Sequence, residues 1–291
     1  MEKIKKAVFP IAGLGTRFLP LSKVVGKEFF PLVDKPMIQY LIEEALNSGI
    51  EKIIFVLRPG KKEVVDYFRK DGKLEKKLKE TQRNHLLKEI RKLQEISKKL
   101  SFSFVYQKEP RGDGHAILQA KKYVKDEPFA VFFGDDIIYS KTPCLLQLYN
   151  VFKTAQRETI ALKRVAKQVI PQYGIVKVEK IANSFFKIKD IVEKPSLEKA
   201  PSDLAIVGRY ILTPEIFPYL ERLKPNKKKE IILANALKEM VRDGKIVYGY
   251  EIEGKWLECG DILRWLKSNI YLSLHHPEFA PEIKKFLKEN E

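Results

Sequence analysis

The sequence has only two cysteines among its 291 residues, Cys144 and Cys259, and no apolar run near the roughly 18 residues that a membrane-spanning helix needs. Two cysteines exclude a disulfide framework and a four-cysteine zinc site. The N-terminal stretch has lysines and a short apolar run, but it lacks a full hydrophobic region and a small-residue cleavage site, which argues against a signal peptide. We therefore expect a reduced, cytoplasmic protein that has no membrane partner.

Acidic residues are outnumbered, because 38 Asp and Glu stand against 55 Lys and Arg, and the formal net charge is +17. Such an excess favours anionic partners, either nucleic acid or phosphorylated small molecules. Nearly half of it falls in residues 61–100, which hold 14 basic and 7 acidic side chains. This segment has no recognition motif and no regular interleaving of aromatic residues, so we expect a solvated helical surface and no nucleic-acid binding.

The first half of the chain alternates apolar strands with amphipathic helices, which is the pattern of a parallel α/β sheet. Residues 61–100 look helical throughout, with one break near Asp71 and Gly72. The strands are expected at residues 5–12, 53–57, 102–106 and 129–133, and the flanking helices at residues 36–48 and 115–124.

After residue 150 the pattern changes to short β-like segments, which predict a mixed or antiparallel extension of the sheet. The sequence shows no internal repeat and no linker, so we expect one compact α/β unit. The segments are residues 159–165, 175–178, 185–192 and 204–212, with helices at residues 214–220, 230–242 and 262–274.

The first strand leads directly into a glycine-rich loop, A-G-L-G-T-R, at residues 12–17. Glycines allow backbone N–H groups to approach a phosphate closely. The loop does not fit the dinucleotide fingerprint, because Phe18 replaces the third glycine, and Gly26-Lys27 lacks the remainder of a P-loop. Arg17 in the loop and Lys27 just beyond it are two cations within reach of one cavity.

The glycine loop continues as F-L-P, and seven further blocks follow in order along almost the whole chain. They are G-K-E-F-F-P-L-V-D-K-P-M-I-Q-Y (26–40), G-D-G-H-A (112–116), F-G-D-D (133–136), Y-G-I-V (173–176), D-I-V-E-K-P (190–195), A-I-V-G-R-Y-I-L-T-P-E-I-F (205–217) and W-L-E-C-G-D (256–261). Together these blocks resemble bacterial UTP–glucose-1-phosphate uridylyltransferases, which belong to the sugar-nucleotidyltransferase family. The resemblance implies a Rossmann-like α/β nucleotidyltransferase fold with a mixed central sheet.

The resemblance implies a reaction in which UTP and glucose 1-phosphate give UDP-glucose and pyrophosphate. A phosphate oxygen of the sugar phosphate attacks the α-phosphorus in line, and no general base is needed because this oxygen is already ionised. Mg²⁺ is the implied cofactor. By resemblance Asp135 and Glu258 bind it, although the family usually has aspartate at the second position. Asp136 is expected to be structural or to support the metal-binding residues, and Asp261 to cap the helix that follows.

The remaining site residues are also carried over from the family. Arg17 and Lys27 are expected to hold the nucleotide phosphates, with Lys27 as the catalytic lysine, and Lys194 is expected to bind the sugar phosphate. The sugar itself would contact Gly174, Glu193 and Gly208. The nucleotide would contact Ala12, Gly13, Gly15, Glu28, Gln107 and Gly112, with the Gln107 amide pairing with the uracil edge.

The sequence departs from the family pattern at two further places. Asp113 stands where the family usually has leucine, which would put a carboxylate close to the base or ribose. Residues 230–235 read E-I-I-L-A-N where the family tends to read E-I-Q-L-T-D, so a contact near the sugar or a subunit surface is expected to differ. His115 is expected to start or orient the following helix.

We expect a single domain over residues 1–291, in which residues 1–150 mainly bind the nucleotide and residues 151–291 form mainly the sugar-binding and C-terminal part. The family suggests a homodimer or homotetramer. The alternatives are a nucleotidyltransferase that uses another sugar 1-phosphate or dTTP, an inactive homologue that binds sugar nucleotides, and a nucleic-acid-binding protein suggested by charge alone.

Overall fold

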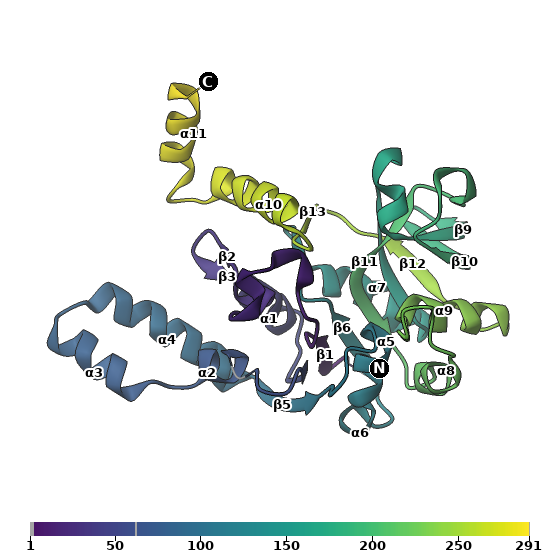
Figure 1. Ribbon diagram of the computed structural model, residues 1–291, viewed down its shortest axis with the longest axis horizontal. Coiled ribbons are helices and arrows are strands. Elements are labelled where there is room, and N and C mark those ends of the chain that lie inside the picture. The colour runs from purple at the N-terminus through teal and green to yellow at the C-terminus, as the bar shows by residue number, and fades with distance from the viewer. Residues whose placement is uncertain (1–2, 62, 291) are drawn as a thin grey trace.

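A nine-stranded mixed sheet organises the protein in the computed structural model, which describes residues 3–61 and 63–290 (Figure 1). One side of the sheet is parallel, as the alternating pattern predicted. Its four strands, in spatial order, are β5 (Ser101–Tyr106), β4 (Lys52–Leu57), β1 (Lys6–Pro10) and β6 (Phe129–Phe132).

The other side of the sheet is mostly antiparallel, so the predicted extension after residue 150 is confirmed. The central strand β11 (Leu204–Leu212) is buried along its whole length and runs antiparallel to β6. Beyond it lie β8 (Thr159–Arg164), β12 (Tyr248–Glu251), β10 (Phe185–Glu193) and β9 (Gly174–Ala182), with only β12 and β8 parallel to each other.

Helices cover both faces of the sheet because successive strand residues point to opposite faces. Phe9 of β1 joins one core, whereas its neighbour Val8 joins the other. The helices α1 (Met37–Asn47) and α7 (Cys144–Ala155) pack into the first core. The second core contains α5 (Asp113–Gln119), α8 (Ile216–Arg222) and α9 (Leu233–Arg242), and the short α6 (Lys121–Val124) follows α5.

A buried ion pair ties the first core to the centre of the sheet. Arg209 of β11 has no solvent-exposed side-chain surface, and its Nε and Nη2 donate to the two carboxylate oxygens of Glu44 on α1 at 3.0 and 2.9 Å. Its other donors reach the backbone oxygens of Gly208 and Asp136, both at 2.8 Å. Since every arm of the guanidinium is hydrogen-bonded, this charge is tolerated in the interior.

The basic segment forms a helical arm that extends from the body of the molecule (Figure 1). It consists of α2 (Glu63–Phe68), α3 (Gly72–Glu80) and α4 (Asn84–Lys99). The predicted break near Asp71 is confirmed, but a second break, at residues 81–83, was not predicted. The Asp71 side chain accepts hydrogen bonds from the backbone N–H groups of Lys73 and Leu74 and thereby starts α3.

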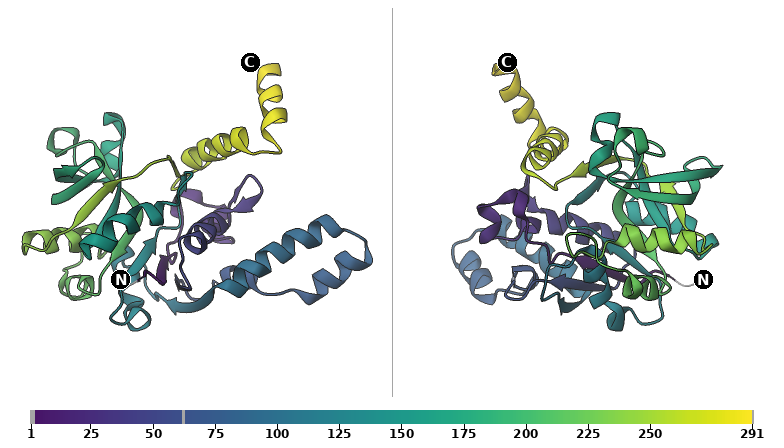
Figure 2. Two further views of the ribbon diagram at one scale, coloured as in Figure 1. Left: turned by 180° about the vertical axis from the view of Figure 1, so that it is seen from behind. Right: turned by 45° about the vertical axis from the view of Figure 1, so that its right-hand side comes forward.

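The C-terminal helices α10 (Ile262–His275) and α11 (Ala280–Glu289) also lie outside the sheet, and α11 projects away from the body (Figure 2). Near α10 sits a small hairpin of β2 (Pro31–Leu32) and β3 (Lys35–Pro36). Within the described residues, no helix combines the length and apolar character needed to cross a membrane.

One predicted helix needs correction, and one pair of strands was not predicted. The helix expected at residues 230–242 begins only at Leu233, because Ile231 exchanges backbone hydrogen bonds with Arg111 and Gly114 instead of starting a helical turn. The pairing of β7 (Asp136–Tyr139) with β13 (Lys255–Glu258) was not predicted, since each strand has only four residues and its partner is more than a hundred residues away.

Candidate functional site

The β7–β13 pair brings together carboxylates from distant parts of the chain. Asp136 is the register partner of Glu258, and the backbone N–H of Cys259 donates to the backbone oxygen of Asp135 at 2.7 Å. A Cβ on Gly260 would lie 3.0 Å from Glu258 Oε1 and 3.4 Å from Asp135 Oδ2. The two carboxylates predicted to bind the metal therefore face one point, which a side chain at position 260 would obstruct.

The neighbouring carboxylate of Asp136 is buried and points into the protein. Its Oδ1 accepts from Trp256 Nε1 at 2.5 Å, and its Oδ2 accepts from the backbone N–H of Gly208 at 3.1 Å. Burial, together with the negative charges of Asp135 and Glu258, raises the pKa of Asp136 to about 7. Asp136 thus links β7, β13 and β11, which agrees with the structural role expected for it.

The two predicted phosphate-binding cations lie at the same place. Lys27 Nζ is 2.5 Å from Asp135 Oδ2, and Arg17 Nη1 donates to the backbone oxygen of Gly260 at 3.4 Å. Burial alone would lower the pKa of Lys27, but the nearby carboxylates, Asp135 first and then Glu28 and Asp136, together outweigh this effect and raise it. Burial would likewise raise the pKa of Asp135, but Lys27 and Arg17 hold it below its ordinary value. Both partners are therefore charged at neutral pH.

Two side chains that the sequence analysis did not select hold Glu258 in position. Arg264 Nη1 donates to Oε1 and the Tyr173 hydroxyl donates to Oε2. Asp261 caps α10, as predicted, by accepting the backbone N–H of Arg264 at 3.0 Å. The first turn of α10 therefore aims Arg264 at Glu258, a contact that motif spacing alone does not reveal.

The glycine loop runs from one cavity to another, and the second of these contains Arg17, Asp135 and Glu258. The first, here called the glycine-loop cavity, has a volume of about 370 Å³. Five predicted nucleotide-binding residues line it: Ala12, Gly13, Gly15, Gln107 and Gly112. The sixth, Glu28, is buried and does not line this cavity, and burial raises the pKa of its carboxyl group.

The second cavity, here called the carboxylate cavity, has a volume of about 210 Å³ and mostly polar walls. It contains the predicted metal-binding and sugar-binding residues, together with Arg17. These residues are Asp135, Glu258, Gly174, Glu193, Lys194 and Gly208. Lys194 adopts a positive φ of 49°, which is uncommon for a residue with a side chain and often occurs at functional sites.

Asp113 lies in the walls of both cavities. Its Oδ1 accepts the backbone N–H of Leu233 at 2.8 Å, at the start of α9, where the N-cap residue Ile232 provides no side-chain hydrogen bond. Burial raises the pKa of Asp113 to about 6. The two departures from the family pattern are thus in contact, since Asp113 caps the helix that begins within residues 230–235.

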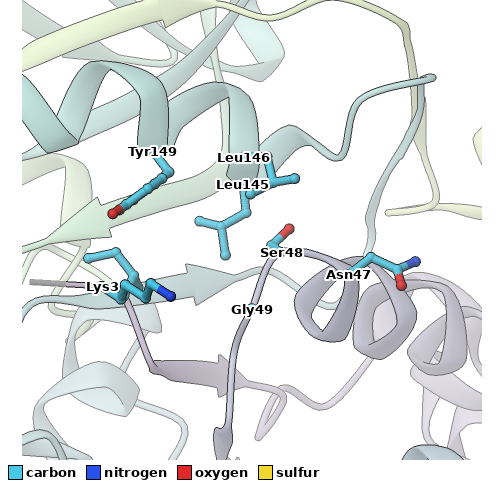
Figure 3. A pocket seen from close by; sticks show the side chains of 8 residues that line it. Lys3, Asn47, Ser48, Gly49, Leu145, Leu146 and Tyr149 are labelled. Atoms are coloured by element: carbon cyan, nitrogen blue, oxygen red, sulfur yellow. The ribbon is translucent and has the colours of Figure 1, made fainter.

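A third cavity, of about 320 Å³, lies between the C-terminal end of α1 and α7 (Figure 3). Its walls include Lys3, Ser48, Leu145 and Tyr149, and none of the predicted site residues lines it.

Among the described residues, no group of three or more His, Cys, Asp or Glu side chains could hold a metal ion. A metal at Asp135 and Glu258 would therefore take its other ligands from substrate or water.

Comparison with known proteins gives one family. The nucleotidyl transferase family model matches residues 6–271. A UTP–glucose-1-phosphate uridylyltransferase of Staphylococcus haemolyticus is 42% identical over 289 residues, which cover 99% of each chain. A UTP-bound UGPase structure from Acinetobacter baumannii is 37% identical, with a TM-score of 0.91 and coverage of 99% of this chain and 100% of that one. A UDP-glucose pyrophosphorylase structure complexed with UDP-glucose is 38% identical, with a TM-score of 0.83 over 92% of this chain and 98% of that one.

Proposed function

This chain belongs to the nucleotidyltransferase family, and we propose that it transfers a uridylyl group from UTP to glucose 1-phosphate, giving UDP-glucose and pyrophosphate. One observation carries the proposal. A glycine-lined cavity and a carboxylate-lined cavity adjoin each other, Lys27 pairs with the Asp135 carboxylate, and Arg17 lines the same cavity as Asp135. The names of the relatives support the choice of UTP and glucose 1-phosphate.

The chemistry explains why the site needs charge and alignment more than an acid or base. A phosphate oxygen of glucose 1-phosphate forms a bond to the α-phosphorus of UTP, and the bond to the β-phosphate bridging oxygen breaks. That nucleophile is ionised at neutral pH, so no proton has to be removed. Two anions must instead be held in line against their repulsion, which positioned cations achieve.

Each cavity accepts one substrate in this proposal. The glycine-loop cavity takes the nucleotide, whose base contacts Ala12, Gly13 and Gln107 and whose phosphates extend along the loop toward Arg17. The carboxylate cavity takes the sugar phosphate, with Lys194 on the phosphate and Glu193 on the hydroxyl groups. Lys27 stabilises charge at the α-phosphate and on the leaving pyrophosphate. Residues 1–150 supply most of the first cavity, although Glu230 also reaches it.

A divalent metal ion is the usual cofactor of such nucleotidyltransferases, and we propose Mg²⁺. The residues fit it, because Asp135 and Glu258 offer hard oxygen donors around one point beside Gly260. Glu258 accepts bonds from Arg264 and Tyr173, but each carboxylate oxygen has more than one lone pair available. When bound, Mg²⁺ neutralises phosphate charge.

The same proposal includes a cytoplasmic homodimer or homotetramer. Cys144 and Cys259 are both buried and free, which supports a reducing compartment. Apolar side chains on α10 and α11 are exposed, among them Leu263, Ile270 and Phe286. Such a surface supports contact with a second copy of the chain.

Pyrophosphate release tests the proposal directly. The purified chain with Mg²⁺, UTP and glucose 1-phosphate is expected to release pyrophosphate and to form UDP-glucose, and omission of either substrate is expected to abolish both products. UTP-dependent phosphate release without UDP-glucose would instead indicate hydrolysis and contradict the proposal.

A further inference from the structure

A side-chain amide in the glycine-loop cavity has its orientation fixed by two neighbours. Gln107, just beyond β5, is only 4% exposed. Its Nε2 donates to the backbone oxygen of Gly112 at 3.0 Å and lies 2.9 Å from His115 Nδ1. A backbone oxygen can only accept a hydrogen bond, so the atom that faces Gly112 must be the NH₂ group.

The same geometry assigns the state of His115. One hydrogen of the Gln107 NH₂ group goes to Gly112, and the other points at Nδ1, so Nδ1 must be the unprotonated nitrogen of a neutral ring. Burial and the charge of Arg111 lower the pKa of His115, although Glu109 acts in the opposite direction, and a neutral ring agrees with this shift. On α5, the side-chain nitrogen of Gln119 lies 3.3 Å from the other ring nitrogen, Nε2, and also 3.3 Å from the backbone oxygen of His115. A neutral ring accepts at only one nitrogen, and the shorter contact, 2.9 Å to Gln107, assigns that role to Nδ1.

We propose that His115 is a positioning residue for nucleobase recognition, which holds the Gln107 amide with its oxygen available to the base. This inference rests on the proposed function, because it takes uracil as the base. With both NH₂ hydrogens engaged, Oε1 is the part of the amide left for a ligand in the glycine-loop cavity. His115 itself is absent from the walls of that cavity, so it acts through Gln107.

An acceptor at this position selects between pyrimidines. Uracil has a single hydrogen-bond donor on its pairing edge, N3–H, so Oε1 can pair only with that group. Cytosine placed in the same way presents the lone pair of N3 to Oε1, which replaces a hydrogen bond with repulsion. A rotated amide would present NH₂ to the base and favour cytosine, but it would also set Oε1 against the Gly112 oxygen and leave Nδ1 without its donor.

Three variants distinguish a positioning role of His115 from a role in packing alone. His115→Leu removes the acceptor, whereas His115→Asn keeps one, because Asn Oδ1 occupies nearly the place of the ring Nδ1. His85→Leu makes the same chemical change at an exposed histidine on the arm. Far-ultraviolet circular dichroism and thermal unfolding of each variant check that it folds.

The test measures the dissociation constants of UTP and CTP by calorimetry, with turnover assayed separately. We expect the preference for UTP over CTP to fall about 3- to 10-fold in His115→Leu, as the loss of one hydrogen bond predicts, and to persist in His115→Asn and His85→Leu. An unchanged preference in folded His115→Leu, or an equal loss in His115→Asn, would overturn the inference. Absence of turnover in a wild-type chain that still prefers UTP would contradict the proposed function but not this role.

A spectroscopic measurement keeps the inference testable if His115→Leu does not fold. The ¹⁵N chemical shifts of the wild-type histidine rings, assigned with His115→Asn, are expected to show a neutral His115 that carries its proton on Nε2. A proton on Nδ1 at neutral pH would overturn the inference, because Nδ1 could then not accept from Gln107.

Discussion

Lys27 Nζ lies 2.5 Å from Asp135 Oδ2, although the two residues are 108 positions apart in the sequence. Lys27 belongs to a short 3₁₀ helix, Lys27–Phe29, and Asp135 stands immediately before β7. The proposed phosphate-binding lysine and the proposed metal-binding carboxylate therefore meet at one point. Each stabilises the charged form of the other, so the site keeps a cation and an anion ready for phosphate and metal.

Asp135→Asn is expected to lower the turnover number for pyrophosphate release by at least about 10²-fold, because it removes a charged metal donor and the partner of Lys27. The fold should be retained, since the amide has nearly the same shape. A steady-state pyrophosphate assay measures the effect, and Asp66→Asn on the exposed face of α2 serves as the control. Turnover near that of the wild type would remove Asp135 from the proposed metal site.

Glu258→Ala is expected to raise the Mg²⁺ concentration needed for half-maximal activity, because one of two carboxylate donors is lost. Tyr173→Phe is the matched variant, since it keeps the carboxylate and deletes only the hydroxyl that donates to it. Its metal requirement should change less. An Mg²⁺ titration of Glu258→Ala that superimposes on that of the wild type would show that Glu258 does not bind the metal.

Lys194→Ala is expected to raise the KM for glucose 1-phosphate about 10-fold or more and to change the KM for UTP much less, because its ammonium group serves the sugar phosphate in the carboxylate cavity. Lys199→Ala, at an exposed lysine nearby, should change neither value. Equal increases in both KM values would contradict the assigned role.

Asp113→Asn is expected to change how stability depends on pH. The ordinary pKa of an aspartate is 3.8, whereas the pKa of folded Asp113 is about 6. Between these values the folded protein binds more protons at this group than the unfolded chain does, so the free energy of unfolding falls as pH rises from about 4 to about 6. The asparagine variant lacks this pH-dependent fall in the free energy of unfolding, but it keeps an acceptor for the Leu233 N–H group.

Urea denaturation from pH 4 to pH 7 measures this difference. The free energy of unfolding of Asp113→Asn minus that of the wild type should increase up to about pH 6 and then level off. A difference that stays constant with pH would show that Asp113 titrates alike in the folded and unfolded states.

Much of the fold could be predicted because its strands are continuous apolar runs. Residues 204–212 illustrate this, since all nine are buried and the predicted bounds match β11. The β7–β13 pair could not be found in this way, because four-residue strands become recognisable only through their partner. The start of α9 was predicted three residues too early, because helical periodicity cannot reveal that Ile231 pairs with Arg111.

The candidate site likewise divides into residues that the sequence could predict and contacts that it could not. The family motifs identified residues that the fold brings to two adjoining cavities, such as Gly112 and Lys194. Contacts between those residues and the rest of the chain were not predictable, because they join positions far apart in sequence. Arg264 and Tyr173 on Glu258, and Asp113 at the start of α9, are of this kind. Asp113 lines the glycine-loop cavity, where the base or ribose was expected, and its Oδ1 also accepts the backbone N–H of Leu233, which the sequence did not predict.

The most direct test of the central claim is pyrophosphate release by the wild-type chain across a matrix of nucleoside triphosphates and sugar 1-phosphates, in the presence of Mg²⁺. The account predicts the highest kcat/KM for UTP paired with glucose 1-phosphate. A higher value for dTTP or for another sugar 1-phosphate would contradict the assigned substrates, and no pyrophosphate from any pair would contradict catalysis itself.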